Sequence, residues 1–272
     1  MVNGYTPATL REALELRAKE AVTLYAGGTD LMLDADEDAN YLFLNKLAEL
    51  KRITVSGGYV RIGAACTYTK VLESPLVPEL LRRAISEIAA PAIRNLGTLG
   101  GNLCNASPKA DGALALFAAN AEVKLSSKDG ERTLPIREFY LGRNKTVLQP
   151  DELLTEILLP DHGLENYYFK KIGARNALAI SRVAFAGVMQ IENSIIRACT
   201  AAFGAVMDVT LVRPEIDAML LGKTIAEAKT LKEEYLKRYE QEIKPIRGRV
   251  SAEYRKTVCM NLLLDFLEAN GI

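Results

Sequence analysis

The sequence has no tryptophan, a single histidine and four cysteines, none of which forms a Cys-x-x-Cys pair. The histidine, His162, follows Leu-Pro-Asp in a predicted turn, so a Ser-His-Asp or Cys-His catalytic arrangement would depend on one loop residue. The cysteines stand far apart, at positions 66, 104, 199 and 259, which is not the ligand spacing of a zinc site or an iron-sulfur cluster. The sequence therefore predicts no metal-binding site formed by cysteine and histidine residues of this chain.

An excess of either charge is also absent, because 34 Lys and Arg residues balance 34 Asp and Glu residues. A neutral chain has no long-range field that attracts nucleic acid or an anionic membrane, so any bound anion must be held by local geometry. No apolar run approaches the roughly 20 residues of a membrane span. The N-terminus has neither the basic region nor the apolar core of a signal peptide. We expect a soluble, cytoplasmic protein that binds neither nucleic acid nor membrane.

The length of 272 residues and the 49% apolar content predict one large domain or two ordinary ones with a proper core. A helix with Pro7 in its first turn opens the pattern, and the last helix shows one apolar stripe of Val258, Leu262, Phe266 and Ala269. Between them the pattern predicts strands at 22–25, 41–44, 152–159, 167–172, 183–191 and 195–203, a hairpin of 53–55 with 59–62, another around 129–130, a short helix through 33, and helices from 78, 112, 214 and 226.

The sequence Asp161-His162-Gly163 follows the predicted strand at 152–159 and precedes the next series of strands, and we interpret it as a linker. The fold class is α+β: an N-terminal domain at 1–162, with subdomains of about 1–54 and 55–162, and a smaller domain at 163–272. For the smaller domain we expect an antiparallel sheet with helices on one face. Residues 90–111 lack periodicity, and a loop of that length in a compact domain is usually functional.

Two glycine pairs, Gly27-Gly28 and Gly100-Gly101, each end an apolar run and precede small polar residues. Without a Cβ, glycine lets backbone N–H groups converge on a phosphate, so two such loops could clasp a diphosphate without a cation. The alternative is that each pair only makes a turn, as Gly57-Gly58 does in the predicted hairpin.

The sequence does not match the other common motifs for binding nucleotides or metal ions. Gly222-Lys223-Thr224 resembles the end of a Walker A loop, but Asp217 stands where its first glycine belongs. No G-x-G-x-x-G follows a strand, so a Rossmann site has no support. The acidic residues at 34–38 lack the glycine and terminal glutamate of a calcium loop, and we interpret them as a solvated loop.

Three segments match a known family: AGGTDL at 26–31, IRNLGTLGGNLCNASPKAD at 93–111 and SAEYRK at 251–256. With them the chain resembles, over nearly its whole length, the FAD-binding medium subunit of molybdenum hydroxylases, the group of xanthine dehydrogenase and carbon monoxide dehydrogenase. The resemblance implies a two-subdomain FAD-binding domain of the vanillyl-alcohol-oxidase type, followed by an α+β C-terminal domain. Two stretches depart from the family: LDADEDAN at 33–40 replaces a segment that is often basic, and 176–178 lacks the common acidic residues.

The resemblance also implies roles for individual residues. Backbone at 26–30 and 98–102 would hold the FAD diphosphate, and Asp111 would accept from ribityl hydroxyls, with capping of the next helix as a compatible alternative. Lys171 would lie near the isoalloxazine and favour the reduced, anionic flavin; the alternative is a surface lysine. No catalytic or metal residue is implied, and the expected cofactor-binding residues are Leu24, Tyr25, Ala26, Gly27, Gly28, Thr29, Asp30, Leu31, Ile88, Gly97, Thr98, Gly100, Gly101, Asn102, Cys104, Asn105, Asp111, Leu153, Leu154 and Lys171.

The function that the resemblance implies is an FAD-dependent oxidoreductase subunit that is inactive on organic substrates without its partners. Electrons would come from a 2Fe-2S small subunit, fed by a molybdopterin-binding large subunit, and pass through non-covalent FAD to NAD or another acceptor. One alternative is a stand-alone flavin-dependent oxidase or reductase of the same fold group, with 163–272 as its substrate-capping domain. A third possibility is a nucleotide-binding scaffold without redox turnover.

Overall fold

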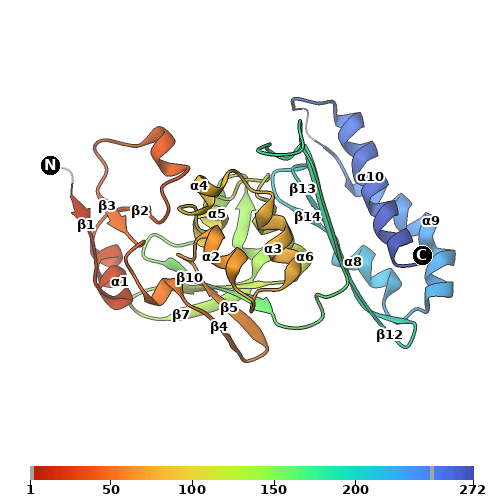
Figure 1. Cartoon of the computed structure of the whole chain (residues 1–272), viewed down its shortest axis with the longest axis horizontal. Coiled ribbons are helices and arrows are strands. Elements are labelled where there is room, and N and C mark those ends of the chain that lie inside the picture. Colours follow the sequence, from red (N-terminus) through yellow and green to blue (C-terminus); the bar gives the residue numbers. More distant parts are fainter. Residues whose placement is uncertain (1–2, 246–247) are drawn as a thin grey trace. The chain divides into compact units, whose positions relative to one another are not determined.

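The computed structural model describes residues 3–245 and 248–272 (Figure 1). Its contacts divide the chain into two compact units. Unit 1 comprises Met1–Val77, Ala89–Ala106 and Asn120–Asp161, and unit 2 comprises Pro78–Ile88, Ser107–Ala119 and His162–Ile272. Two segments that precede the predicted linker therefore pack with the C-terminal region.

Unit 1 contains two main sheets and several short helices. Its elements are β1 (Gly4–Tyr5), α1 (Leu10–Lys19), β2 (Thr23–Tyr25), η1 (Leu31–Asp34), β3 (Tyr41–Phe43), η2 (Glu49–Lys51), β4 (Ile53–Ser56), β5 (Tyr59–Gly63), α2 (Tyr68–Glu73), α4 (Pro91–Arg94), α5 (Leu99–Asn105), β6 (Glu122–Ser126), β7 (Glu131–Pro135), α7 (Ile136–Phe139), β8 (Tyr140–Gly142), β9 (Lys145–Thr146) and β10 (Leu153–Pro160). The predicted N-terminal helix is confirmed as α1, but Pro7 lies outside it: the Thr9 side chain accepts from the N–H of Glu12, and the helix starts at Leu10.

The first sheet of unit 1 is parallel, in the order β1-β3-β2, which makes β2 an edge strand. The second is antiparallel, in the order β4-β5-β10-β6-β7. Both predicted hairpins are confirmed: β4 pairs with β5 and β6 with β7. Gly57 and Gly58 turn the first hairpin with φ of 63° and 82°, the left-handed conformation that a two-residue turn between antiparallel strands requires.

Residues 90–111, which we predicted as a long loop without regular structure, contain the helices α4 and α5. In α5 the Thr98 side chain accepts from the N–H of Gly101, and the apolar residues Leu99 and Leu103 are buried one turn apart. The helical period was missed because α5 is short and its sequence, LGGNLCN, contains two glycines, which disfavour helix in isolation.

Unit 2 is built around one antiparallel sheet in the order β11-β12-β13-β14. Its elements are α3 (Glu79–Ser86), α6 (Asp111–Ala118), β11 (Tyr167–Ile172), β12 (Val183–Glu192), β13 (Ile195–Gly204), β14 (Leu211–Val212), α8 (Pro214–Asp217), η3 (Ala218–Leu220), α9 (Ile225–Glu242) and α10 (Ala252–Ala269). The strands predicted at 167–172, 183–191 and 195–203 are thus confirmed.

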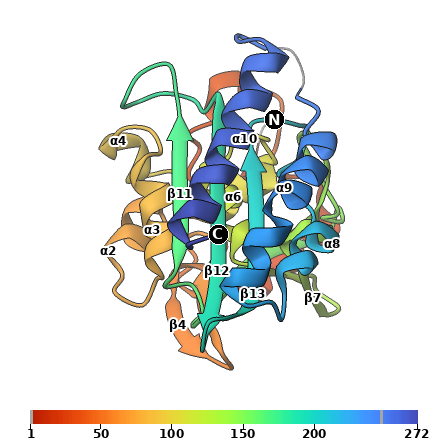
Figure 2. The same ribbon diagram turned by 90° about the vertical axis from the view of Figure 1, so that its right-hand side faces the viewer.

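Helices cover both faces of this sheet: α9 and α10, from the predicted domain at 163–272, lie on one face, as expected for that domain, and α6, from the chain before it, covers the other face. Gly187 of β12 lies against Phe266 of α10, whereas Gly204 of β13 lies against Leu114 of α6. Gly187 pairs with Ala201, which is three residues before Gly204 on β13. Since side chains alternate along a strand, Gly187 and Gly204 point to opposite faces of the sheet. Figure 2 shows α10 and α9 in front of β12 and β13, with α6 behind. A strand covered on both faces reads as a continuous apolar run, as 183–189 does.

The stripe predicted for α10 is partly wrong. Leu262 and Phe266 are buried as expected, but Ala269 is exposed, and the buried face also includes Cys259, Leu263 and Leu267. The face is broader than one row because α10 packs against both β12 and α9. No helix in the described part of the chain has the length and hydropathy needed to cross a membrane.

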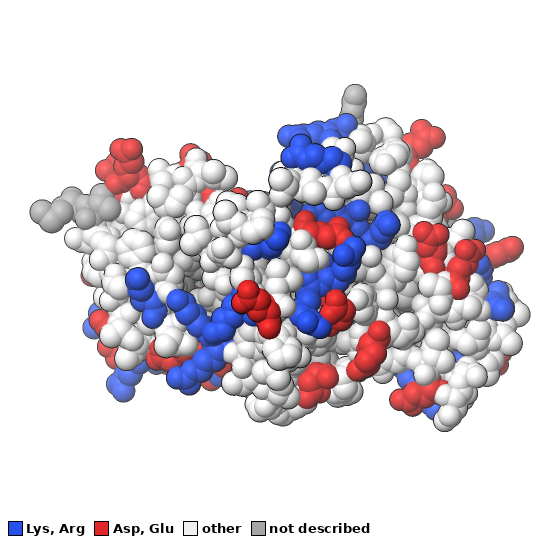
Figure 3. Space-filling view, in the orientation of Figure 1, with Lys and Arg blue, Asp and Glu red and all other residues white. Residues whose placement is uncertain are grey.

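Basic and acidic side chains are mixed on the face drawn in Figure 3. In the described part of the chain, several ion pairs leave both partners accessible, such as Arg11 with Glu15 and Arg238 with Glu234. Exposed pairs of this kind contribute roughly 0 to 1 kcal/mol each. The pair of Lys171 with Asp111 is different, because both side chains are less than a tenth exposed.

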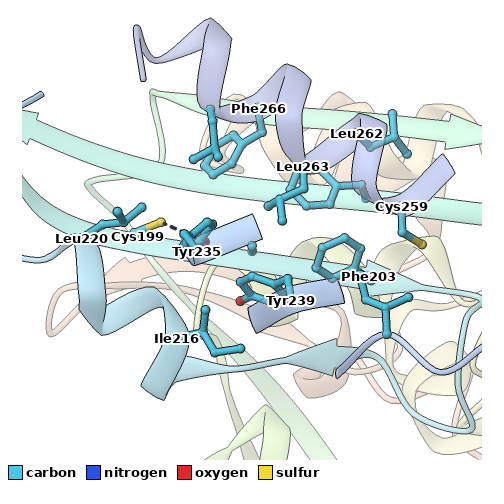
Figure 4. Close-up of a cluster of buried hydrophobic side chains, with 14 of the residues drawn as sticks. Cys199, Phe203, Ile216, Leu220, Tyr235, Tyr239, Cys259, Leu262, Leu263 and Phe266 are labelled. Carbon is cyan, nitrogen blue, oxygen red and sulfur yellow. Dashed lines mark hydrogen bonds between the residues drawn. The ribbon is translucent and has the colours of Figure 1, made fainter. Parts of the chain in front are cut away.

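The core of unit 2 holds a buried carboxyl group, that of Asp217 at the end of α8. Its Oδ1 accepts from the hydroxyls of Tyr235 and Tyr239, both at 2.7 Å, and its Oδ2 accepts from the N–H of Ala201 at 3.2 Å. Figure 4 shows the two tyrosines of α9 among apolar side chains of the sheet and α10. Burial raises the pKa of Asp217 to about 7, although its three hydrogen bonds lower it. Asp217 thereby ties α8 to α9 and to β13.

Candidate functional site

The first glycine loop of unit 1 offers a row of open backbone donors. It follows β2, the edge strand, and Gly28 has a left-handed φ of 69°. Its carbonyl groups are used: Tyr25 accepts from Leu44, and Gly28 accepts from Met32. The N–H groups of residues 26–30, however, donate no hydrogen bond within the described part of the chain. Such a row of open amides is suited to receive an anion.

The two glycine loops meet in unit 1 through their backbones. A Cβ placed on Gly27 would overlap the carbonyl oxygen of Leu96 and would stand 3.0 Å from the Cα of Gly97. Gly100 is equally confined, because a Cβ there would lie 2.5 Å from the carbonyl oxygen of Ala64. These glycines are thus required for close backbone packing, which fixes the position of the open amides.

In the second glycine loop, the N–H groups of residues 99–101 donate hydrogen bonds within the protein. Leu99 donates to Cys66, Gly100 donates to Ala64, and Gly101 donates to the Thr98 hydroxyl, each at 3.0 Å. What this loop presents instead is the exposed surface of Gly101 and the side chain of Asn102. The buried Oδ1 of Asn102 has no hydrogen-bond partner among the described residues. A buried acceptor without a donor is costly, and a ligand hydroxyl or N–H would satisfy it.

Cys104 and Asn105 end helix α5, next to this loop. Burial raises the pKa of the Cys104 thiol to about 12. Because the thiolate is the reactive form, this cysteine is not a nucleophile at neutral pH. We therefore expect no covalent bond between Cys104 and the flavin.

Unit 2 brings together Asp111 and Lys171, which are 60 residues apart in the sequence. The Lys171 ammonium lies 2.8 Å from Asp111 Oδ2 and donates to the carbonyl oxygen of Glu87 at 2.8 Å. The Ser181 hydroxyl donates to Asp111 Oδ1 at 2.6 Å. Burial raises the pKa of Asp111, whereas Lys171 and Ser181 lower it and the Glu87 charge raises it.

These contacts exclude the alternative roles that the sequence left open for Asp111 and Lys171. Asp111 is the first residue of α6 and makes no cap, so the helix-capping alternative is wrong; the N-cap is Ala110, which has no side-chain hydrogen bond. Lys171 has a side chain that is only 8% exposed, so the surface-lysine alternative is also wrong. Nothing in the local sequence around Ser181 indicated a partner, and this residue was missed.

The remaining candidates are mainly apolar. Leu153 and Leu154 of β10 are buried, and Leu153 belongs to the core that also contains Leu42 and Leu47. Ile88 follows α3 in unit 2 and is partly exposed. The residues from Leu24 to Thr29 and Leu31 are partly exposed, and Asp30 is exposed. Among the described residues, no group of three or more His, Cys, Asp or Glu side chains forms a metal site.

Comparisons with known proteins agree along the chain. One family model, described as the FAD binding domain in molybdopterin dehydrogenase, matches residues 1–162, and another, the CO dehydrogenase flavoprotein C-terminal domain, matches residues 167–269. The chain is 34% identical to a xanthine dehydrogenase FAD-binding subunit of Escherichia coli O157:H7, over 72% of this chain and 71% of that protein. It is 32% identical to the nicotinate dehydrogenase FAD-subunit of Eubacterium barkeri, over 70% and 69%.

Solved structures give the same result. A chain of the carbon monoxide dehydrogenase from Hydrogenophaga pseudoflava that lacks the Mo-pyranopterin moiety matches with a TM-score of 0.89 and 26% identity. The match covers 98% of this chain and 96% of that chain.

Proposed function

The chain belongs to the family of FAD-binding domains of molybdopterin dehydrogenases, and on that premise we propose that it is the electron-transfer flavoprotein subunit of a molybdenum hydroxylase complex. Bound FAD supplies the redox chemistry, taking electrons from a 2Fe-2S small subunit and passing them to NAD or another acceptor. A molybdopterin-binding large subunit is the proposed source of these electrons. Relatives named as an FAD-binding subunit and as a carbon monoxide dehydrogenase medium chain support a role within a larger complex.

The observation that carries the proposal is the row of open N–H groups at residues 26–30. A diphosphate needs several hydrogen-bond donors, and backbone amides fixed in a loop supply them without mobile side chains. The close packing of Gly27 on Leu96 and Gly97 holds these amides in place before any ligand arrives. A chain with no net charge can bind an anionic dinucleotide in this way.

Each unit, taken by itself, holds an acceptor that suits a ligand hydroxyl group. In unit 1 the buried Oδ1 of Asn102 is without a donor among the described residues. In unit 2 each carboxylate oxygen of Asp111 accepts one hydrogen bond, and a carboxylate has about four acceptor positions. Asp111 therefore keeps acceptor capacity for ribityl hydroxyls while it holds Lys171.

Lys171 supplies a fixed positive charge. Its ammonium is paired with Asp111 and with the carbonyl oxygen of Glu87, so its position is set by two contacts of 2.8 Å. Beside the isoalloxazine, a fixed cation favours the reduced flavin, which carries more negative charge. In a buried setting this interaction is stronger than in water.

The first experiment measures the flavin. Protein purified under native conditions should carry about one FAD per chain, and acid precipitation should release it, because the Cys104 thiol is protonated and buried. Flavin that stays with the precipitated polypeptide would show a covalent bond and contradict the proposal. Protein that neither retains nor rebinds FAD would refute the site assignment.

The second experiment tests the need for partners. The purified chain is assayed with purines, aldehydes and aromatic alcohols and an artificial electron acceptor, alone and after addition of the 2Fe-2S and molybdopterin chains. We expect hydroxylation only in the reconstituted complex. Robust turnover by the chain alone would instead support the stand-alone flavin oxidase or reductase. A flavin that dithionite cannot bleach would support the scaffold without redox turnover.

A further inference from the structure

The ion pair of unit 2 is completed by a third side chain. Asp111 and Lys171 are 6% and 8% exposed, so their charges have little contact with water. Desolvated charges are stable only when hydrogen bonds satisfy the remaining donor and acceptor positions. The Ser181 hydroxyl does this for Asp111 Oδ1, at 2.6 Å, while Lys171 occupies Oδ2 at 2.8 Å.

Ser181 is placed to orient the carboxylate rather than to fill space. It is 1% exposed and lies just before β12, at the end of the segment that leaves β11 after Lys171. One donor on each oxygen fixes the rotation of the Asp111 side chain, since turning it would break one of the two bonds. Without Ser181, Asp111 would be held on one side only.

The charges around the cluster make this orientation important. The groups that face Asp111 are Lys171 from β11, Ser181 from the segment before β12, and Glu87 from the end of α3. Burial and the Glu87 charge raise the pKa of Asp111, and Lys171 and Ser181 lower it. Ser181 therefore helps to keep Asp111 ionised, and an ionised Asp111 keeps the Lys171 ammonium paired.

We propose that Ser181 is a positioning residue for FAD. Its hydrogen bond to Asp111 Oδ1 sets which acceptor positions of the carboxylate remain for FAD hydroxyls. The same bond keeps Asp111 Oδ2 oriented toward the Lys171 ammonium. The proposal rests on the proposed function, because it assumes that Asp111 contacts bound FAD. It assigns to Ser181 no direct contact with the cofactor.

The test is the FAD affinity of apoprotein, measured by equilibrium titration. Ser181→Ala should weaken binding about tenfold, or roughly 1.4 kcal/mol, because it removes the hydrogen bond that orients the carboxylate. Ser126→Ala is the matched control: Ser126 is also 1% exposed and bonds the Thr155 hydroxyl at 2.9 Å, but its hydrogen bonds go to Thr155 and Glu131 rather than to Asp111. Its FAD affinity should stay at the wild-type value.

A double-mutant cycle separates positioning from general destabilisation. In an Asp111→Asn background, Ser181→Ala should cause no further loss of affinity, because the carboxylate it orients is gone. If Ser181→Ala does not fold, Ser181→Cys keeps the volume with a much weaker donor and should show the same loss. Wild-type affinity in the folded Ser181 variants, or full additivity in the cycle, would overturn the inference. Failure of the wild-type apoprotein to bind FAD would instead overturn the proposed function.

Discussion

Replacing Asp217 with asparagine should remove a large part of the pH dependence of this protein's stability. The carboxyl group is 3% exposed and accepts from two tyrosine hydroxyls and one backbone N–H, with no cation among these partners. Its pKa in the folded protein is about 7, against an ordinary value of 3.8, and burial is the main cause. Asparagine keeps the shape of the side chain but cannot ionise.

The direction in which the free energy of unfolding changes with pH follows from proton binding. Between pH 3.8 and about 7 the folded state holds a proton on Asp217 that the unfolded state has lost, so the free energy of unfolding falls as pH rises through this range. The contribution is fully present below pH 4 and is lost above pH 7. At about 1.4 kcal/mol for each pH unit, the total is about 4 kcal/mol.

Asparagine has its own cost, which does not depend on pH. Its amide group cannot accept from all three donors, so at least one of them, such as the N–H of Ala201, loses its partner. An unsatisfied buried donor costs about 1 to 3 kcal/mol. We therefore expect wild type to be the more stable protein at pH 4 and to lose this advantage by pH 8.

The assay is urea unfolding followed by far-UV circular dichroism at several pH values from 4 to 8, on both proteins. Other groups titrate alike in the two proteins, so the difference between them isolates Asp217. Tyr235→Phe serves as a second variant: it removes one donor to Oδ1, raises the pKa of Asp217 further and should move the pH window upward. A difference between wild type and Asp217→Asn that stays constant from pH 4 to 8 would refute the reasoning.

Two further predictions concern one glycine that is replaced and one glycine that is introduced. Gly27→Ala should reduce FAD affinity of the apoprotein at least a hundredfold, because its Cβ would overlap the Leu96 carbonyl; Gly130→Ala is the control, since its Cβ would meet no described atom within 4 Å, and equal affinities would contradict the loop assignment. Ser194→Gly should raise the free energy of unfolding by about 0.5 to 1 kcal/mol, because Ser194 has a left-handed φ of 63° in the two-residue turn between β12 and β13, where Asn-Gly is favoured. Urea unfolding measures it, and an unchanged or lower value would rule out strain at this turn.

Sequence alone was sufficient wherever the deciding interactions are local. The Gly57-Gly58 hairpin was predictable because two left-handed residues and flanking alternation specify it within ten residues. The first glycine loop was predictable for a related reason: its motif encodes a backbone shape, and that shape is what leaves the amides of 26–30 open. The family resemblance, which the comparisons confirm, depends on this loop and on two other short segments, 93–111 and 251–256.

Tertiary structure decided the features that depend on which distant residues meet. Helix α5 forms despite two glycines because packing buries Leu99 and Leu103, a contribution that outweighs weak local propensity. Helices cover both faces of the unit 2 sheet because α6, from the middle of the chain, packs with it. Ser181 meets Asp111 across 70 residues. A polar side chain shows no periodicity that identifies its partner, so only the folded chain, by burying both groups and requiring their hydrogen bonds to be satisfied, brings such a pair together.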